Sequence, residues 1–191
     1  NLEQVIEQSC NTGSVKVGEL LGPKNLYYYI RKFGFGDKTG IDLPSEAEGL
    51  VRPPERWSGV SIGAVSIGQE IGVSGIQMMQ AVSTIANGGR LVRPHVISRI
   101  TDSDNNTVVS ESSLDVRHRV ISPKVTEAVT KMMTMVTKSG SGTQGALDDY
   151  IVAGKTGTSE KLGTHGVSGH IASFIGFVPA KEPKVLIYVV L

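Results

Sequence analysis

The sequence contains a single cysteine, Cys10, so no internal disulfide can form, while the redox compartment is left open. No Cys/His cluster with metal-ligand spacing surrounds it, and we expect neither a metal ion nor a cofactor. Excess charge is also lacking, because the formal net charge is +1 and no run of Lys and Arg forms a local basic patch. Phosphate binding needs a clustered basic surface, so nucleic acid is not an expected partner.

Long apolar runs are missing as well. The longest one, Val185 to Leu191, is far shorter than the ~20 residues that span a bilayer. Asn1 to Gln4 have neither the basic start nor the apolar stretch of a signal peptide, so we expect no membrane segment among these residues. The chain starts inside a helical pattern without a cap and stops on an apolar strand. We therefore expect residues 1–191 to be one partial domain that is truncated at both ends.

Apolar spacing predicts a helical part followed by a sheet. The predicted helices run from Leu2 to about Ser9, from about Pro23 to Phe33, from Ser74 to Ala86 and from Ser122 to Val136. The predicted strands include a pair around a polar turn at residues 102–106 and three at the end, about Tyr150 to Thr158, Ile171 to Val178 and Lys184 to Leu191. Short connections between the last three favour an antiparallel meander, and helices before a sheet indicate the α+β class.

The strongest local signal is Gly154-Lys155-Thr156-Gly157-Thr158. A phosphate-binding loop would need glycine at Asp149 and a strand-to-helix turn, and neither fits. The alternative is the Lys-Thr-Gly strand of serine acyltransferases that act on penicillin-like and D-alanyl substrates. That chemistry needs a cation and neighbouring hydroxyls to hold a carboxylate. Period-two alternation places Thr156 and Thr158 on one side, and Gly157 removes a Cβ so that another backbone can approach.

Several further motifs resemble the class B penicillin-binding proteins in order and spacing. Ser9-Cys10-Asn11 resembles the S-x-N motif of that family, in which a hydroxyl relays a proton and an amide holds its neighbours. The other matching segments are Phe33 to Gly36, Gly40 to Pro44, Glu48-Gly49, Ser66 to Gln69, Ile76-Gln77, Ala86 to Gly89 and Ala172 to Ala180. The resemblance covers nearly the whole chain and implies a partial β-lactamase/transpeptidase-like fold.

The resemblance also implies a role for each site residue. Ser9 would sit between the catalytic lysine and the leaving-group nitrogen, and Asn11 would orient that lysine and a substrate carbonyl. Lys155 would supply positive potential and bond to Ser9. Thr156 and Thr158, with Gly157 between them, would hold the carboxylate of a stem peptide or drug, and the Thr158 N–H would be an oxyanion donor.

The implied activity is a peptidoglycan D,D-transpeptidase that binds stem peptides and β-lactams and works with cell-wall synthesis proteins at the extracytoplasmic face of the membrane. The family's nucleophile lies in an S-x-x-K motif, and no serine in this chain has lysine three residues on. These residues alone are therefore not expected to acylate. Two alternatives remain: a serine β-lactamase, for which no Glu-x-x-x-Asn element is found, and a non-catalytic module that binds a peptide or partner.

Overall fold

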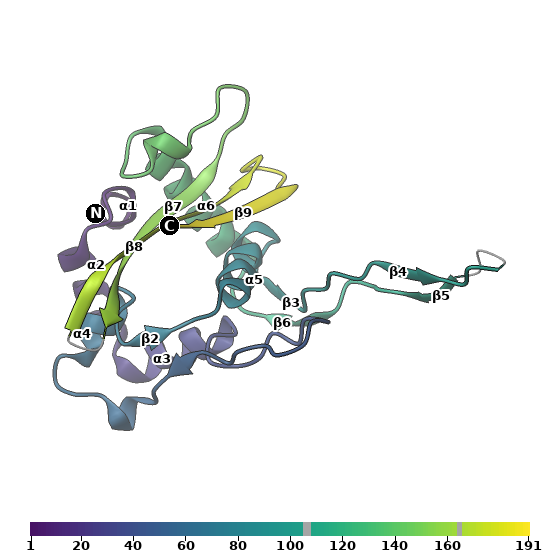
Figure 1. The fold of residues 1–191 in the computed structure, drawn as a ribbon. Coiled ribbons are helices and arrows are strands. Elements are labelled where there is room, and N and C mark those ends of the chain that lie inside the picture. Colours follow the sequence, from purple (N-terminus) through teal and green to yellow (C-terminus); the bar gives the residue numbers. More distant parts are fainter. Residues whose placement is uncertain (105–107, 164–165) are drawn as a thin grey trace.

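A computed structural model describes residues 1–104, 108–163 and 166–191. Within these ranges the first half is mainly helical and the last third is a sheet (Figure 1). The helices are α1 (Leu2–Glu7), α2 (Asn11–Leu21), α3 (Pro23–Lys32), α4 (Ser61–Ser66), α5 (Gly75–Ala86) and α6 (Pro123–Lys138), with 3₁₀ turns η1 (Pro54–Arg56) and η2 (Thr143–Gly145). No helix in the described part of the chain is long and apolar enough to cross a membrane.

The predicted starts of α5 and α6 are confirmed by their caps. Ser74 and Gln77 form a reciprocal capping box, with the Ser74 hydroxyl accepting from the Gln77 N–H and Gln77 Oε1 accepting from the Ser74 N–H. The Ser122 hydroxyl caps α6 by accepting from the Val125 N–H, without a reciprocal bond. The expectation of an uncapped first helix is wrong, because the Asn1 side chain accepts from the Gln4 N–H at 3.0 Å. Asn followed three residues later by Gln supplies the same reciprocal pair.

Helix α2 was not predicted. The Ser9–Asn11 segment, expected to end a helix, instead joins two helices, since α1 ends at Glu7 and α2 begins at Asn11. Two glycines lower the intrinsic helix propensity of this stretch by about 1 kcal/mol each. Both are required by packing: a Cβ at Gly13 would overlap the Val5 side chain, and a Cβ at Gly18 would overlap Ser66 of α4. Tertiary contact therefore outweighs local preference here.

The strands form small antiparallel pairs and one larger sheet. The pairs are β1 (Leu50–Val51) with β2 (Ile71–Gly72), β3 (Arg90–Val92) with β6 (Val116–Arg119), and β4 (Arg99–Thr101) with β5 (Val108–Glu111). The larger sheet contains β7 (Ala153–Gly163), β8 (Gly166–Val178) and β9 (Val185–Val190) in the order β7-β8-β9. The predicted antiparallel meander and the α+β class are confirmed.

The hairpin between β7 and β8 is longer than its glycines suggest. The sequence favoured an end near Thr158 and a restart near Ile171, whereas the two strands pair as far as Gly163 and Gly166. Cross-strand hydrogen bonding outweighs the low strand preference of glycine in this segment. The polar turn predicted at residues 102–106 lies partly outside the described residues, but the strands β4 and β5 that flank it are present.

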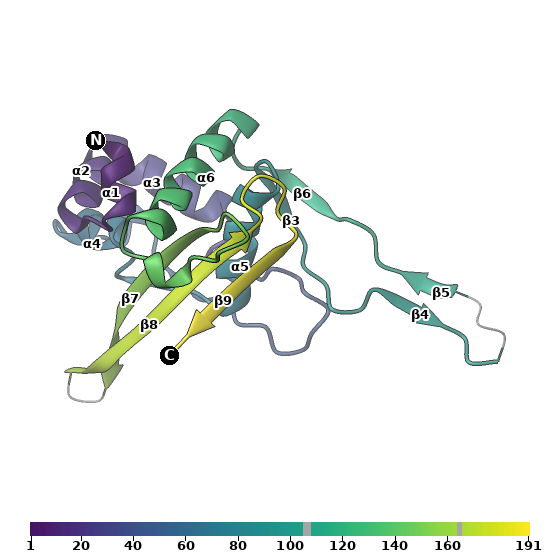
Figure 2. The same ribbon diagram turned by 90° about the horizontal axis from the view of Figure 1, so that it is seen from above.

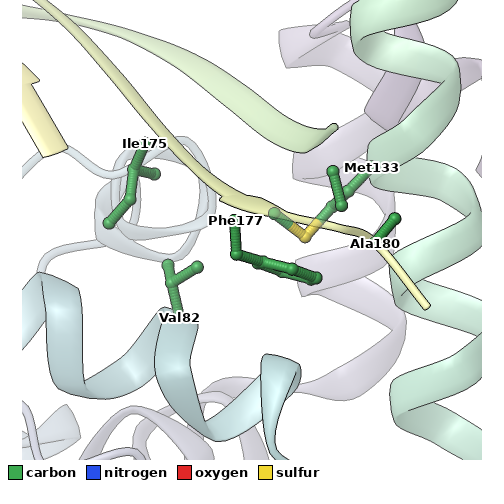
Figure 3. Packing of buried hydrophobic residues seen from close by; sticks show 6 residues of the cluster. Val82, Met133, Ile175, Phe177 and Ala180 are labelled. Atoms are coloured by element: carbon green, nitrogen blue, oxygen red, sulfur yellow. The ribbon is translucent and has the colours of Figure 1, made fainter. Parts of the chain in front are cut away.

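The main core lies where α5 and α6 pack against the sheet (Figure 3). Phe177 of β8 is 1% exposed, and burying such a side chain contributes about 1.5–3 kcal/mol. Its neighbours in the same cluster come from both helices, from the sheet and from the turn after β8: Val82, Met133, Ala153, Ile175 and Ala180. This core fixes β7 and β8 against the helical part, and it thereby fixes the strand that contains Lys155.

A two-stranded arm projects away from this body in both views (Figures 1 and 2). The residues of β4 and β5 that form it are exposed. At its base the Asp42 carboxylate accepts hydrogen bonds from the Val96 and Ile97 N–H groups, at 2.7 and 2.8 Å. Arg117 donates to the carbonyl of Thr39. The arm is thus tied to the loop that follows α3, far from the Lys155 strand.

Candidate active site

A groove of about 390 Å³ lies between the helical part and the edge strand of the sheet. It gathers residues from both ends of the sequence. Its lining residues are Ser9, Asn11, Ser14, Ser66, Ile67, Lys155, Thr156, Gly157 and Thr158. Every site residue expected from the sequence therefore borders one groove.

Ser9 occupies the junction between α1 and α2. Its φ of 54° lies in the left-handed region, which is costly for a non-glycine residue by about 1–2 kcal/mol. The next residue, Cys10, is the N-cap of α2, and its N–H donates to the carbonyl of Val5 at 2.9 Å. This tight turn reverses the chain between the two helices and leaves the Ser9 hydroxyl in contact with Lys155.

Lys155 lies on β7, and its ammonium reaches across to the α1–α2 junction. Lys155 Nζ donates to Ser9 Oγ at 2.7 Å, across a sequence separation of 146 residues. It also donates to the Thr156 carbonyl at 2.9 Å and to Thr156 Oγ1 at 3.4 Å. The side chain is half-buried, and this burial lowers the pKa of Lys155 below its ordinary value of 10.5.

Asn11 lies on the wall of the groove formed by the helical part. It opens α2 and lines the groove. Among the described residues, Lys155 donates hydrogen bonds to Ser9 and Thr156. The contacts expected of Asn11, with a substrate carbonyl and with the lysine of the S-x-x-K motif, stay predictions.

The position of Gly157 is explained by its neighbour in the sheet. Gly157 pairs with Ser173 of β8, and a Cβ added at Gly157 would lie 2.7 Å from Ser173 Oγ. A side chain at this position would therefore require Ser173 Oγ to move. The approach of another backbone to Gly157 stays a prediction from the sequence. Thr156 and Thr158, on either side, both line the groove.

Sequence reasoning missed four residues around the groove. Ser14 follows Asn11 by three positions on α2, and it could have been found only if that helix had been predicted. Ser66 and Ile67 belong to a matching motif but had been given no role, although both line the groove. Ser141 lies in the loop after α6, and its Oγ is 3.1 Å from Thr156 Oγ1.

A second polar cavity, of about 430 Å³, lies at the base of the arm. Two of its charged groups hold the backbone: both Asp42 oxygens accept backbone N–H groups, and Arg93 Nε donates to the Gly40 carbonyl. The hydrogen bonds of Asp42 lower the pKa of its carboxyl, which is consistent with a structural role. No group of metal-ligating side chains is found among the described residues. The groove beside Lys155 is therefore the candidate active site.

The family model described as the penicillin binding protein transpeptidase domain matches residues 1–191. The chain belongs to this family. A phosphate-loop interpretation is excluded, since Lys155 lies within a strand that pairs along β8 rather than at a strand-to-helix turn. The sequence-based assignment to the class B penicillin-binding proteins, and to their transpeptidase-like fold, is confirmed.

Named relatives place the chain within this penicillin-binding family. Stage V sporulation protein D of Bacillus subtilis is 38% identical over 188 residues, which are 97% of this chain and 29% of that protein. The Neisseria flavescens protein named "Probable peptidoglycan D,D-transpeptidase PenA" is 29% identical over 97% of this chain and 44% of its own length. The chain therefore spans less than half the length of these two curated relatives.

Solved structures agree with the sequence relatives. Penicillin-binding protein 3 of Mycobacterium tuberculosis, solved in complex with aztreonam, superposes with a TM-score of 0.92 at 30% identity. The match covers 99% of this chain and 44% of that one. The groove described above thus lies in a fold that is shared with a drug-binding member of the family.

Proposed function

We propose that the whole protein containing this chain is a serine peptidoglycan D,D-transpeptidase. In this reaction a serine attacks the penultimate carbonyl of a stem peptide ending in D-Ala-D-Ala, and D-alanine leaves. An amine from a neighbouring strand then resolves the acyl-enzyme. The nucleophile belongs to the family's S-x-x-K motif, which these 191 residues do not contain, so the chain by itself does not acylate.

The contact between Lys155 and Ser9 is the observation that supports this proposal best. A half-buried ammonium 2.7 Å from a hydroxyl biases that hydroxyl toward accepting and passing on a proton. Ser9 is therefore assigned to proton relay toward the leaving nitrogen, and Lys155 to the positive potential of the site. Asn11, which lines the groove, is assigned to a carbonyl of the substrate.

The opposite wall of the groove suits a carboxylate. Thr156 and Thr158 offer hydroxyl groups on the same strand as the Lys155 ammonium, and Gly157 lies between them without a side chain. The terminal carboxylate of a stem peptide and the carboxylate of a β-lactam would both fit this arrangement. The M. tuberculosis relative, solved with aztreonam and with ampicillin, supports the second class of ligand.

The cellular setting follows from the substrate. We assign residues 1–191 to part of a larger transpeptidase domain at the extracytoplasmic face of the bacterial membrane, where peptidoglycan is cross-linked. Its partners there would be other cell-wall synthesis proteins.

The test uses the whole protein and its Lys155→Ala variant. The unmodified protein should be covalently acylated by benzylpenicillin, and it should release D-alanine from a D-Ala-D-Ala stem peptide while forming a cross-linked product with an acceptor amine. Losing a charge-assisted hydrogen bond costs about 1.5–3 kcal/mol. Lys155→Ala should therefore slow acylation by about ten- to a hundredfold, with a nearly unchanged melting temperature.

Each alternative function gives a different result in the same assay. A serine β-lactamase would hydrolyse benzylpenicillin with rapid turnover and leave little stable adduct. A non-catalytic module would bind without any covalent product. Acylation of Lys155→Ala at the rate of the unmodified protein would show that the Lys155 strand is only structural, and the assigned site would be wrong.

A further inference from the structure

The loop that follows α6 places a hydroxyl group beside Thr156 of the Lys155 strand. Ser141 Oγ lies 3.1 Å from Thr156 Oγ1, and either oxygen could be the donor. Ser141 is exposed and is not among the residues that line the groove, whereas Thr156 is. Thr156 is therefore the contact through which Ser141 meets this wall of the groove.

The hydrogen bonds around Thr156 limit where its proton can point. A threonine hydroxyl has one proton to donate and two lone pairs to accept with. The Lys155 ammonium, which can only donate, occupies one lone pair at 3.4 Å. When Ser141 donates to the second lone pair, the Thr156 proton must find an acceptor elsewhere, and the groove is the open side. When Thr156 donates to Ser141 instead, no proton remains for an anion.

We propose that Ser141 is a positioning residue that donates to Thr156 Oγ1 and so directs the Thr156 proton toward a carboxylate bound in the groove. This inference rests on the proposed function and names one more residue of the same site. A chain of two hydroxyls that point the same way also polarises the terminal O–H and strengthens its bond to an anion.

Helix α1, which precedes Ser9, also holds Ser141 in place. Its N–H donates to the Glu7 carbonyl at 3.0 Å, and the neighbouring Ser139 hydroxyl donates to Glu7 Oε1 at 2.7 Å. Gly140 lies between them, where a Cβ would overlap the Glu7 carbonyl. The last residue of α1 therefore fixes both the turn that contains Ser9 and the loop that contains Ser141.

The test compares a β-lactam acid with its ester in the whole protein. Ser141→Ala should slow acylation by benzylpenicillin about three- to tenfold, the effect of one neutral hydrogen bond. Acylation by benzylpenicillin methyl ester, which has no carboxylate, should proceed at the same rate in Ser141→Ala as in the unmodified protein. In a Thr156→Val background, Ser141→Ala should have no further effect on either compound.

Two control variants separate positioning from loop packing. Ser139→Ala removes a hydroxyl from the same loop but leaves the main-chain bond from Ser141 to Glu7, so its acylation rates should not change. Ser141→Thr keeps the hydroxyl and should retain the preference for the acid. Equal slowing of acid and ester by Ser141→Ala, no slowing of either, or an effect that persists with Thr156→Val would each refute the positioning role. Failure of the unmodified protein to react with either compound would refute the proposed function as well.

Discussion

At the residue scale, Lys155 combines a charge with partial burial. Among the described residues its ammonium group donates to three acceptors, as many as it has protons. Burial nevertheless favours the neutral amine and lowers the pKa of Lys155. The ammonium charge that the proposed mechanism needs is therefore lost at a lower pH than on an exposed lysine.

This burial predicts the alkaline limb of the acylation profile. The acylation rate should fall as pH rises through the lowered pKa of Lys155, at a pH below the ordinary lysine value of 10.5. The unfolded chain binds this proton more tightly than the folded one, so between the two pKa values stability should rise with pH. The measurement is the second-order rate of benzylpenicillin acylation by the whole protein from about pH 7 to 11.

The matched variant is Lys155→Arg. An arginine side chain stays charged throughout this range, so the alkaline limb should disappear, even if the different geometry lowers the rate at every pH. An alkaline limb at the same pH in both proteins would assign it to another group and contradict the role given to the Lys155 charge.

The residues of the site were predictable to different degrees. The motifs containing Ser9 and Lys155 could be paired from the family resemblance, although their sequence separation of 146 residues hides the contact from any local pattern. Ser141 could not be found in this way. A serine in a Gly-rich loop is common, and only the bond from its N–H to Glu7 places it beside Thr156.

At the element scale, the contact between α2 and α4 positions the S-x-N segment. Gly18 of α2 is buried where a Cβ would overlap Ser66, which itself lines the groove. Gly63 of α4 faces Val15 at ordinary van der Waals distances of 3.6 and 3.8 Å from its added Cβ. A Cβ would therefore clash at Gly18 but would fit at Gly63, although both glycines lie in the same helix interface.

This difference predicts opposite effects of the same substitution. Gly18→Ala should destabilise the protein by about 1–3 kcal/mol, because helix packing or the Ser66 side chain must move. Gly63→Ala should be neutral or stabilise by up to about 1 kcal/mol through helix propensity. Thermal melts of both variants check this, and Gly18→Ala with Ser66→Gly should recover part of the loss. Equal melting temperatures for the two alanine variants would mean that this interface is loosely packed.

The elements that were predicted are those with strong local patterns. The sequence of helix α6 has an amphipathic repeat, a serine cap and proline at its start, and all three are observed in the structure. Strands β1 and β2 contain two residues each and exist only because Leu50 pairs with Gly72 and Val51 with Ile71. Pairing over such a separation leaves no periodic signal in a two-residue segment, so the sequence could not reveal it.

At the scale of the whole molecule, the groove gathers the residues of the proposed site, but no serine of the chain has a lysine three positions on. The purified 191 residues should therefore not be covalently labelled by a fluorescent penicillin, because neither Ser9 nor Cys10 has a lysine three positions on. The measurement is gel fluorescence after denaturation, with the whole protein as the positive control. Labelling that disappears in Ser9→Ala would identify Ser9 as a nucleophile and overturn its assignment as a proton relay.

The Ser9–Lys155 contact also has a consequence for biosynthesis. During translation Ser9 is added 146 residues before Lys155, so the contact cannot form until most of this chain has been synthesised. Closing a loop of this length costs roughly 4 kcal/mol of conformational entropy, and local contacts near either end do not offset this cost. The long-range packing of β7 and β8 against α5 and α6 must offset it, so the contact forms late. The groove beside Lys155 should therefore be completed only after β7 and β8 have been synthesised.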